Sequence, residues 1–468
     1  MRRALPSISL SVAVFLAAMA TWGLVVTGGE ARVVTVLAVA ALGCAWSWRP
    51  LFVLRKKRAA RLAEGETEWQ RDLRTVWAVS KSLVGTLTVW TMVSVGMYLS
   101  HDTGDPLQQQ LAAWGRNHGL GEIIDYLEAQ TYDVPPSKDP AKELSLSVGA
   151  APTSSTTQPT VSTDPTGTDP VDTGPTTTVY LGPQAPANIT PFFSPGLAGE
   201  GEWTVIANAG GYPALWATAI RPYPAAGGVV ASMVVFDQTF LRAGMFNGSE
   251  EPGGEWVRDD RVPVELYPAL VAAMNGGFRF EHVKGGYMTE GRVVKPLNEV
   301  DATLAVRKSD GKLVLGALGR EIKDDGSWLS IRQNLVLMVD DGKSMVQEGI
   351  DNAVFWGANY GKDVYVNRSA VCELEDGRLA YMIIGKVSAD QMAESMINLG
   401  CVKAIQLDIN GTWPNFFTFE PRDGGGLKPI FLDNRMGSNT YRYLKGSTKE
   451  FFALFDATLV PPGSVLDA

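Results

Sequence analysis

The chain has 468 residues, which is too long for one ordinary domain, and a formal net charge of -9 from 41 basic and 50 acidic residues. Many of the basic residues lie in the first 75 positions, so the remainder of the chain is clearly acidic. An acidic surface repels phosphate backbones and anionic headgroups, and this argues against nucleic acid or anionic lipid as the main partner.

Three apolar runs in the first 100 residues predict three transmembrane helices. They are Ala4–Thr27, Val33–Leu54 and Val76–Leu99, and each is long enough to cross ~30 Å of hydrocarbon. The loop after the second run begins with four basic residues at 55–58, which predicts that this loop and the N-terminus are cytoplasmic. A cleaved signal peptide is the alternative for the first run. We therefore predict a multi-pass protein of the cell membrane, with everything after the third span outside the cytoplasm.

Residues 101–133 are predicted to form short amphipathic helices, over about 106–116 and 121–130. Leu107, Leu111 and Trp114 begin an apolar stripe at helical spacing, and the stripe is broken near Gly119. We expect these helices to rest on the membrane or on the rest of the protein.

Residues 134–194 are predicted to be a Thr/Pro-rich disordered linker. Positions 151–180 contain eleven Thr, five Pro and three Ser, with no Lys or Arg, so this tract cannot build an apolar core. We interpret it as a flexible tether.

Residues 195–468 are predicted to be one globular region of α+β class, with a mixed or antiparallel sheet and packed helices. Turn sequences separate short apolar runs, among them Asp340-Asp341-Gly342 and Glu375-Asp376-Gly377. One helix is expected from Ser388 to Leu399, closed by Gly400. The expected strands include Val229–Phe236, Leu304–Val306, Leu313–Leu315, Asn334–Val339, Leu379–Ile384 and Ala404–Leu407.

Cys372 and Cys401 both fall in predicted strand segments of this region. They could pair in an oxidising compartment. Strand geometry rarely places two Cα atoms at bridging distance, however, so we expect an unpaired state more than a bridge. Their spacing offers no zinc site.

Two polar patches lie at the ends of predicted strands. Asp408 ends an apolar strand and precedes a turn, where open sheets place ligand contacts. An Asp that hydrogen-bonds its own turn is the alternative. Asn275, Gly276 and Gly277 follow another apolar run, and their amides and carboxamide suit an anion or a sugar. A tight turn is the alternative there.

Other candidates are cations, amides and one further carboxylate. Arg368 stands before an apolar run, where its guanidinium could clamp a phosphate or pair with a surface acid. The remaining candidates lie in similarly polar turns: Glu290, Lys295, Arg332 and Asn334.

The globular region lacks the residues of several common reaction types. It contains one histidine, His282, no Gly-x-Ser-x-Gly motif and no phosphate-binding loop of the Walker type. Carboxylates, amides and cations remain, and such a set suits sugar or phosphate-ester chemistry. No cofactor is predicted. A divalent cation at Asp340-Asp341 is left open, although a solvated hairpin tip is the preferred interpretation.

In their order along the chain these motifs resemble the phosphodiester glycosidase family. The similarity spans roughly residues 200–455, includes a strand followed by Asp340-Asp341-Gly342, and resembles a membrane-anchored bacterial branch. The chain departs from the family pattern at Cys372, where glycine is expected, and at 408–412, where Asp-Gly-Gly-Gly-Ser is expected. The other matching residues are Asn275-Gly276-Gly277-Phe278, Arg368-Ser369-Ala370, Leu399-Gly400 and Leu407-Asp408.

This resemblance implies an extracytoplasmic hydrolase that cleaves a sugar from a sugar-1-phosphodiester in an envelope glycan or glycolipid. In that interpretation Asp408, Glu290 and Arg368 are catalytic. The substrate-binding residues are Asn275, Gly276, Gly277, Lys295, Arg332, Asn334 and Asn410. Two alternatives stay open: a catalytically inactive glycan-binding module, and a scaffold that positions partners through its membrane spans.

Overall fold

A computed structural model describes residues 67–99, 107–120, 123–124, 134–147, 182–346, 355–357, 365–409, 413–433, 435 and 441–468. The chain divides into two compact units, Met1–Asp102 with Leu107–Gly121, and Thr103–Pro106 with Glu122–Ala468. The predicted spans Ala4–Thr27 and Val33–Leu54 lie outside the described residues.

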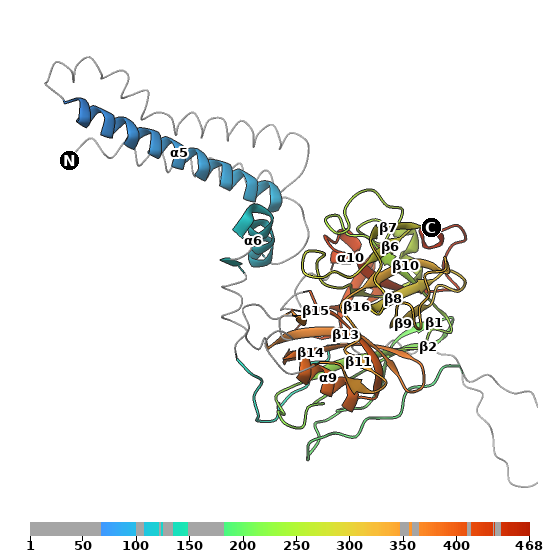
Figure 1. Ribbon diagram of the computed structural model, residues 1–468. Helices are drawn as coiled ribbons and strands as arrows, with labels where there is room; N and C mark the ends of the chain where they lie inside the picture. Colours follow the sequence, from blue (N-terminus) through green and yellow to red (C-terminus); the bar gives the residue numbers. More distant parts are fainter. Residues whose placement is uncertain are drawn as a thin grey trace, which may run out of the picture. The chain divides into compact units, whose positions relative to one another are not determined.

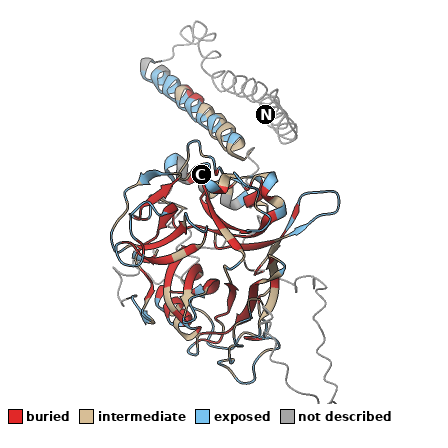
Figure 2. Cartoon of the chain, turned by 90° about the vertical axis from the view of Figure 1, so that its right-hand side faces the viewer, coloured by how far each residue is buried: buried red, intermediate tan, exposed pale blue. Residues whose placement is uncertain are grey.

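The N-terminal unit contains the helix α5, Glu68–Leu99, which corresponds to the third predicted span. From Asp72 to Leu99 it is long and apolar enough to cross a membrane, and it is the one such helix in the part of the chain that the structure describes. Much of this helix is coloured as exposed in Figure 2. Its exposed large apolar residues include Trp77, Leu87 and Trp90. One N-terminal apolar helix is therefore present, whereas three spans are not shown.

A shorter helix, α6, runs from Leu107 to Gly115 and agrees with the prediction for 106–116. It continues into a short π-helical segment, η1, Arg116–Leu120, which is kinked at His118 and Gly119. Most of the second predicted helix, 121–130, lies outside the described residues.

The C-terminal unit is built mainly from antiparallel sheets (Figure 1). The first has eight strands in the order β1-β2-β3-β14-β13-β15-β11-β12. Their bounds are Thr204–Ala209, Tyr212–Ile220, Ala231–Phe236, Leu379–Val387, Val366–Leu374, Cys401–Ile409, Val339–Asp340 and Lys343–Ser344.

Two five-stranded sheets complete the unit, and we call them the β10 sheet and the β5 sheet. The β10 sheet has the order β7-β6-β10-β8-β9, with bounds Arg292–Lys295, Tyr287–Thr289, Trp328–Gln333, Ala302–Arg307 and Leu313–Ala317. The β5 sheet has the order β17-β16-β5-β18-β4, with bounds Leu427–Phe431, Phe416–Pro421, Leu270–Asn275, Phe451–Asp456 and Leu241–Phe246.

The predicted fold class is therefore correct only in part. Every pairing between named strands in the described residues is antiparallel. Helices are few in this unit, and the helix α9, Ala389–Asn398, is the longest of them among the described residues. Several apolar runs of the sequence lack a helical repeat. In the structure they form strands that are buried on both faces.

The central strands of the eight-stranded sheet face two cores. Along β13 and β14, Val371 and Ile383 point into the core shared with the other sheets, whereas Ala370 and Met382 point into the core that contains α9. This alternation follows from the two-residue period of a strand. Both faces are covered, and the strands consequently form the buried centre of the unit (Figure 2).

The predicted helix after β14 is confirmed with its ends. Ser388 caps α9, because its hydroxyl accepts a hydrogen bond from the Gln391 amide while the Gln391 side chain bonds back to Ser388. Gly400 follows with φ of +86°, the left-handed conformation that ends many helices.

The hairpin predicted at Asp340-Asp341-Gly342 is also confirmed, between β11 and β12. The strand predicted over Asn334–Val339 is wrong for most of its length, since β10 ends at Gln333 and β11 begins at Val339. The segment crosses between sheets instead: the Asn334 amide bonds to Ala302 of β8, and the Met338 amide bonds to Ala404 of β15.

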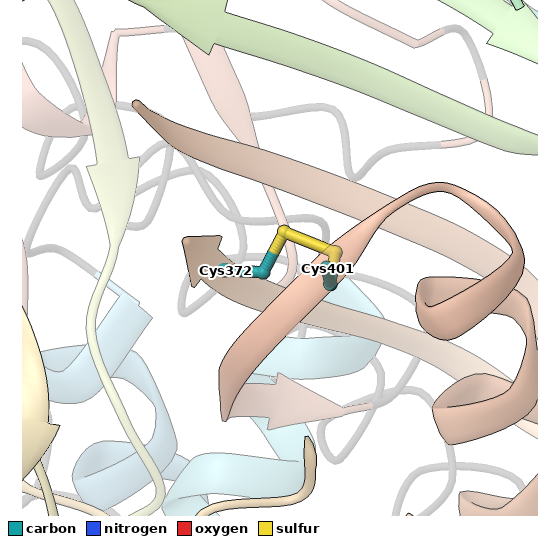
Figure 3. The surroundings of a disulfide bond; sticks show 2 residues. All are labelled: Cys372 and Cys401. Carbon is teal, nitrogen blue, oxygen red and sulfur yellow. A yellow bond between two sulfur atoms is a disulfide. The ribbon is translucent and has the colours of Figure 1, made fainter. Parts of the chain in front are cut away.

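Cys372 and Cys401 form a disulfide, contrary to the preferred expectation (Figure 3). Cys372 lies near the end of β13 and Cys401 begins β15, and these strands are neighbours. Because α9 returns the chain from β14 to β15, the two Cα atoms lie 5.7 Å apart, within the range that a disulfide spans.

Replacing both cysteines by serine is expected to lower the free energy of unfolding by about 3–4 kcal/mol. The bridge closes a loop with a sequence separation of 29, and opening it releases that loop in the unfolded chain. Urea unfolding of the full chain in detergent, followed by tryptophan fluorescence, measures the change. A reductant should destabilise the native protein by a similar amount and leave the double variant unchanged; equal stability of the two oxidised proteins would refute the prediction.

Candidate functional site

Strand ends from all three sheets supply the polar residues singled out in the sequence. Asp408 lies near the end of β15, Asn275 ends β5, and Arg332 lies near the end of β10. Lys449 and Glu450 directly precede β18 of the β5 sheet. All five side chains are buried.

A β-bulge in β15 turns the side chain of Asp408 toward this site. Ala370 pairs with Gln406 and Arg368 pairs with Ile409, so β15 has one extra residue between these pairs. In a regular strand Asp408 would share the face of Gln406, which hydrogen-bonds Arg368. The bulge places it with Lys449 of the β5 sheet instead.

Lys449 connects Asp408 to the glycine turn. Its ammonium donates to a carboxylate oxygen of Asp408 and to the carbonyl oxygen of Gly277 at 2.8 Å. The other carboxylate oxygen of Asp408 accepts the amide of Ile409 at 2.7 Å. Burial raises the pKa of Asp408 above its ordinary value, and the nearby Lys449 opposes this rise.

Glu450 forms the second half of the cluster. Its Oε1 accepts the Gly277 amide at 2.8 Å and Nε of Arg332 at 2.6 Å. Its Oε2 is buried and has no hydrogen-bond partner among the described residues. We call Asp408, Lys449, Glu450 and Arg332 the two-carboxylate cluster. The Gly277 peptide groups lie between its two ion pairs.

The glycine turn packs closely against the two-carboxylate cluster. Its amides are occupied within the protein, since Gly276 donates to the backbone and Gly277 to the side chain of Glu450. Neither glycine has a left-handed φ. A Cβ on Gly276 would lie 2.4 Å from Glu450 Oε1, and one on Gly277 would lie 3.0 Å from Arg332 Nη2. Glycine is needed here so that the cluster can approach the backbone closely.

Asn275 and Asn334 join sheets. The carboxamide of Asn275 donates to Ser369 Oγ at 3.0 Å and accepts from the Tyr381 hydroxyl at 2.9 Å. Asn334 accepts the Phe278 amide at 3.1 Å and donates to the carbonyl of Leu407 at 2.9 Å. Both are buried, and they position the turn and the end of β15 relative to each other.

Arg368 lies on the opposite face of the eight-stranded sheet from Asp408. Its guanidinium donates to the carbonyls of Val387 and Trp356 at 3.0 and 2.8 Å. Burial lowers its pKa to about 10, although Asp390 acts in the opposite direction. These contacts place the guanidinium of Arg368 in the α9 core, away from the Asp408 carboxylate.

Glu290 is not brought to the cluster. It sits at the turn between β6 and β7, where its carboxylate accepts the amides of Val257 and Arg258 at 3.1 and 2.8 Å. Within the described residues it shares no hydrogen-bond partner with Asp408.

Lys295 lies near enough to Arg332 of the cluster for the charge of Arg332 to affect its pKa. Its ammonium donates to the carbonyls of Phe280 and Val283, and burial, followed by the charge of Arg332, lowers its pKa.

The predicted contact residue Asn410 lies outside the described residues. The candidate cation ligands form a hairpin tip: Asp340 pairs with Arg320 at 2.7 Å, and Asp341 is exposed.

Sequence reasoning missed Lys449, Glu450 and Glu251. A Lys-Glu pair immediately before the apolar run Phe451–Phe455 was the available signal for the first two. Glu251 accepts the Phe280 amide at 3.1 Å, and burial raises its pKa, while Lys449 and Arg279 oppose the rise. The site thus gathers three carboxylates with several cations, a set able to bind a proton, activate water and balance the charge of an anionic substrate.

No curated protein sequence matches the chain. One similar solved structure is the catalytic domain of zebrafish N-acetylglucosamine-1-phosphodiester alpha-N-acetylglucosaminidase, with 18% identity, a TM-score of 0.36, and coverage of 53% of this chain and 86% of that one. A hypothetical protein from Synechocystis has 9% identity, a TM-score of 0.33, and coverage of 53% and 64% respectively.

The family comparison concerns the part of the chain that supplies most of the site. The model of the phosphodiester glycosidase family matches residues 269–408, which begin just before β5 and end at Asp408. Lys449 and Glu450 lie beyond the matched residues. Over residues 269–408 the chain is therefore similar to the phosphodiester glycosidase family.

Proposed function

We propose that the protein hydrolyses a sugar-1-phosphodiester of an envelope glycan or glycolipid outside the cytoplasm. The family match supports the reaction class. The observation that carries the proposal is the two-carboxylate cluster, in which Asp408 is buried against Lys449 beside the Asn275-Gly276-Gly277 turn. A buried carboxyl whose pKa is shifted by burial and by one specific charge partner is a candidate functional group.

Asp408 acts in its ionised form, which Lys449 stabilises. It accepts a proton from water as the water oxygen bonds to the anomeric carbon of the sugar. The bond from that carbon to the phosphate oxygen breaks, and the phosphomonoester leaves with the bonding electrons. Since a phosphomonoester is a good leaving group, this step depends little on a strong general acid.

Glu450 replaces Glu290 as the second carboxylate in this proposal. Its unpartnered Oε2 stabilises the positive charge that develops on the sugar ring in the transition state. Arg279 and Lys295 neutralise the substrate phosphate. Arg279 already pairs with Glu250 and Glu251 at 3.4 and 3.8 Å, so a phosphate would compete with these carboxylates.

The protein is proposed to hold this domain outside the cytoplasm through its membrane segments. The order is 1–100 for the membrane part, 101–133 for amphipathic helices, 134–194 for the segment that contains the Thr/Pro-rich tract and 195–468 for the glycosidase-like region. The disulfide supports an oxidising compartment, because such bonds are rare in the cytosol.

An inactive glycan-binding module is the second candidate. Its support is that Asp408 is only 5% exposed and already pairs with Lys449, and that Ile409 and Asn410 stand where the family pattern has glycines. This candidate predicts retention of a glycan without release of product.

The full chain in detergent is expected to release free sugar and a phosphomonoester in equal amounts from N-acetylglucosamine-1-phosphate methyl ester or a related diester. Chromatography of both products measures the reaction. The matched control substrate is the corresponding methyl glycoside without phosphate, which should be stable. Binding of the diester without release of either product would favour the binding module, and absence of both would refute the proposal.

A further inference from the structure

The Thr/Pro-rich tract is flanked on both sides by residues that pack on the same C-terminal unit. We call residues 134–147 the strap. Its backbone bonds to the unit at Ala141, whose amide donates to Gly227, and at Ser147, whose amide donates to Leu432, both at 2.8 Å. The hydroxyl of Ser145 donates to the buried carboxylate of Asp433 at 2.8 Å. The strap is therefore part of the folded unit.

Close backbone approach shows that the strap is closely fitted to the unit. Gly227 and Gly228 face it, and a Cβ on either would lie 2.7 Å from the nearest strap atom, at Pro140 and Ser137 respectively. Leu146 packs against the core shared by the sheets. Displacing the strap would expose this apolar contact and leave Asp433 with fewer partners.

The residues after the tract are fixed to the same unit. The amide of Ile189 donates to Gly201 at 2.9 Å, Trp203 Nε1 donates to Ala187 at 3.0 Å, and Arg378 donates to Gln184 at 2.8 Å. The residues on both sides of the tract, up to Ser147 and from Gly182, thus belong to one folded unit. Residues added between two points that are both fixed to this unit do not increase the distance that the unit can reach from α5.

Within the N-terminal unit, α6 and η1 contact α5 through hydrogen bonds. Trp114 Nε1 donates to Ser94 Oγ at 3.0 Å, and His118 lies 3.0 Å from the same oxygen. The chain from Leu120 to the first strap residue, Val134, spans 14 residue steps, or about 50 Å at full extension. The 35 steps from Ser147 to Gly182 would add about 120 Å if the tract were the tether.

We propose that the tract is an excursion of the C-terminal unit rather than its tether, and that the substrate is a sugar-1-phosphodiester held at the membrane surface by a lipid. The short connection at 121–133 alone sets the reach of the domain from α5. A lipid-linked diester stays within that reach, whereas a distant wall polymer does not. This inference rests on the proposed function and on α5 lying in the membrane.

Insertion of the same 30-residue Gly/Ser segment at two places tests the proposal. One variant carries it after Gly167 in the tract, and the other after Ala129 in the connection. The full chain is reconstituted in liposomes with a lipid-linked diester, and a soluble diester is assayed in parallel. Effective concentration falls roughly as the −3/2 power of linker length, so the Ala129 insertion should lower lipid-linked turnover about fivefold. The Gly167 insertion should leave it unchanged.

Equal effects of the two insertions, or a loss with the Gly167 insertion alone, would overturn the proposal. Turnover of the soluble diester should be the same in all three proteins. If the soluble diester is turned over but the insertions act alike, the inference fails and the proposed function stands. If no diester is turned over, the proposed function fails.

A second measurement does not depend on activity. A protease site is placed in the tract after Gly167, and the protein is cleaved in salt-washed membranes. The C-terminal fragment should remain in the membrane fraction, because the strap still holds it, and Leu146→Asp should release it. Release of the fragment without the Leu146 change would show that the tract is the tether and would overturn the proposal.

Discussion

Asp408→Asn is expected to lower the turnover number for a sugar-1-phosphodiester by about 10²–10⁴-fold, the range for loss of a positioned acid–base group. Asparagine keeps an oxygen for the Ile409 amide but cannot accept a proton from water at neutral pH. Release of free sugar by the purified full chain measures the effect. The matched control is Glu290→Gln, whose carboxylate binds the amides of Val257 and Arg258 outside the cluster and should leave turnover unchanged.

The same substitution should also reduce stability, by about 3 kcal/mol, because it leaves the buried ammonium of Lys449 without its carboxylate. Thermal unfolding of both variants separates this effect from the loss of catalysis. A protein that remains folded at the assay temperature and turns over substrate at the original rate would rule out Asp408 as the proton acceptor.

The pH dependence follows from the direction of the Asp408 shift. Burial raises the pKa of this carboxyl, so the ionised form becomes dominant at a higher pH than for an ordinary Asp. The acid limb of kcat/KM should therefore lie above pH ~3.9. The raised pKa also makes stability depend on pH. The contribution of this carboxyl to the free energy of unfolding is complete below the pKa that it has in the unfolded chain, and it is lost as pH rises through the pKa that it has in the folded protein. An acid limb at or below the ordinary pKa would contradict this assignment.

Glu450→Gln is expected to have the second largest effect, with loss of turnover and of stability together. Glutamine still offers an oxygen to the Gly277 amide and to Arg332, but Arg332 loses its buried counter-charge. Breaking a buried ion pair from one side costs about 3–5 kcal/mol. Turnover should fall because no charge remains at Oε2 to oppose the developing positive charge on the sugar.

The matched control is Glu420→Gln, which removes one partner of the exposed Lys428–Glu420 pair at 3.4 Å. Exposed pairs contribute little to stability, so this variant should behave as the unmodified protein in both assays. The two roles of Glu450 can be told apart at low temperature, where the variant stays folded. Full turnover there would leave Glu450 a purely structural role.

Several features of the fold could be predicted from sequence because their causes are local. The helix after β14 has its capping residue, its glycine stop and its apolar period in the sequence, and the structure confirms it. The hairpin at Asp340-Asp341-Gly342 depends on residues that tolerate a left-handed φ, and it is confirmed too. The Asn334–Val339 strand failed because hydrogen bonds to two different sheets determine that segment.

The composition of the site was predicted better than its geometry. The motifs at Asn275, Arg332, Asn334 and Asp408 lie together, since they lie at or next to the ends of strands whose sheets meet in the core. Glu290 and Arg368 could not be excluded by sequence, because a turn carboxylate and a strand arginine look the same whichever face they occupy. The bulge at Asp408 depends on pairing with β13, which a single strand does not reveal.

The sequence by itself determined the acidic C-terminal region, the apolar helix at 72–99, the capped helix α9 and the polar strand ends, since each depends on neighbouring residues. The tertiary structure alone decided the pairing of Cys372 with Cys401, the antiparallel order of the sheets and the contact of Glu450 with the Gly277 amide. These depend on contacts between residues far apart in the chain. Such contacts are fixed only when the sheets pack and bury the charges they carry.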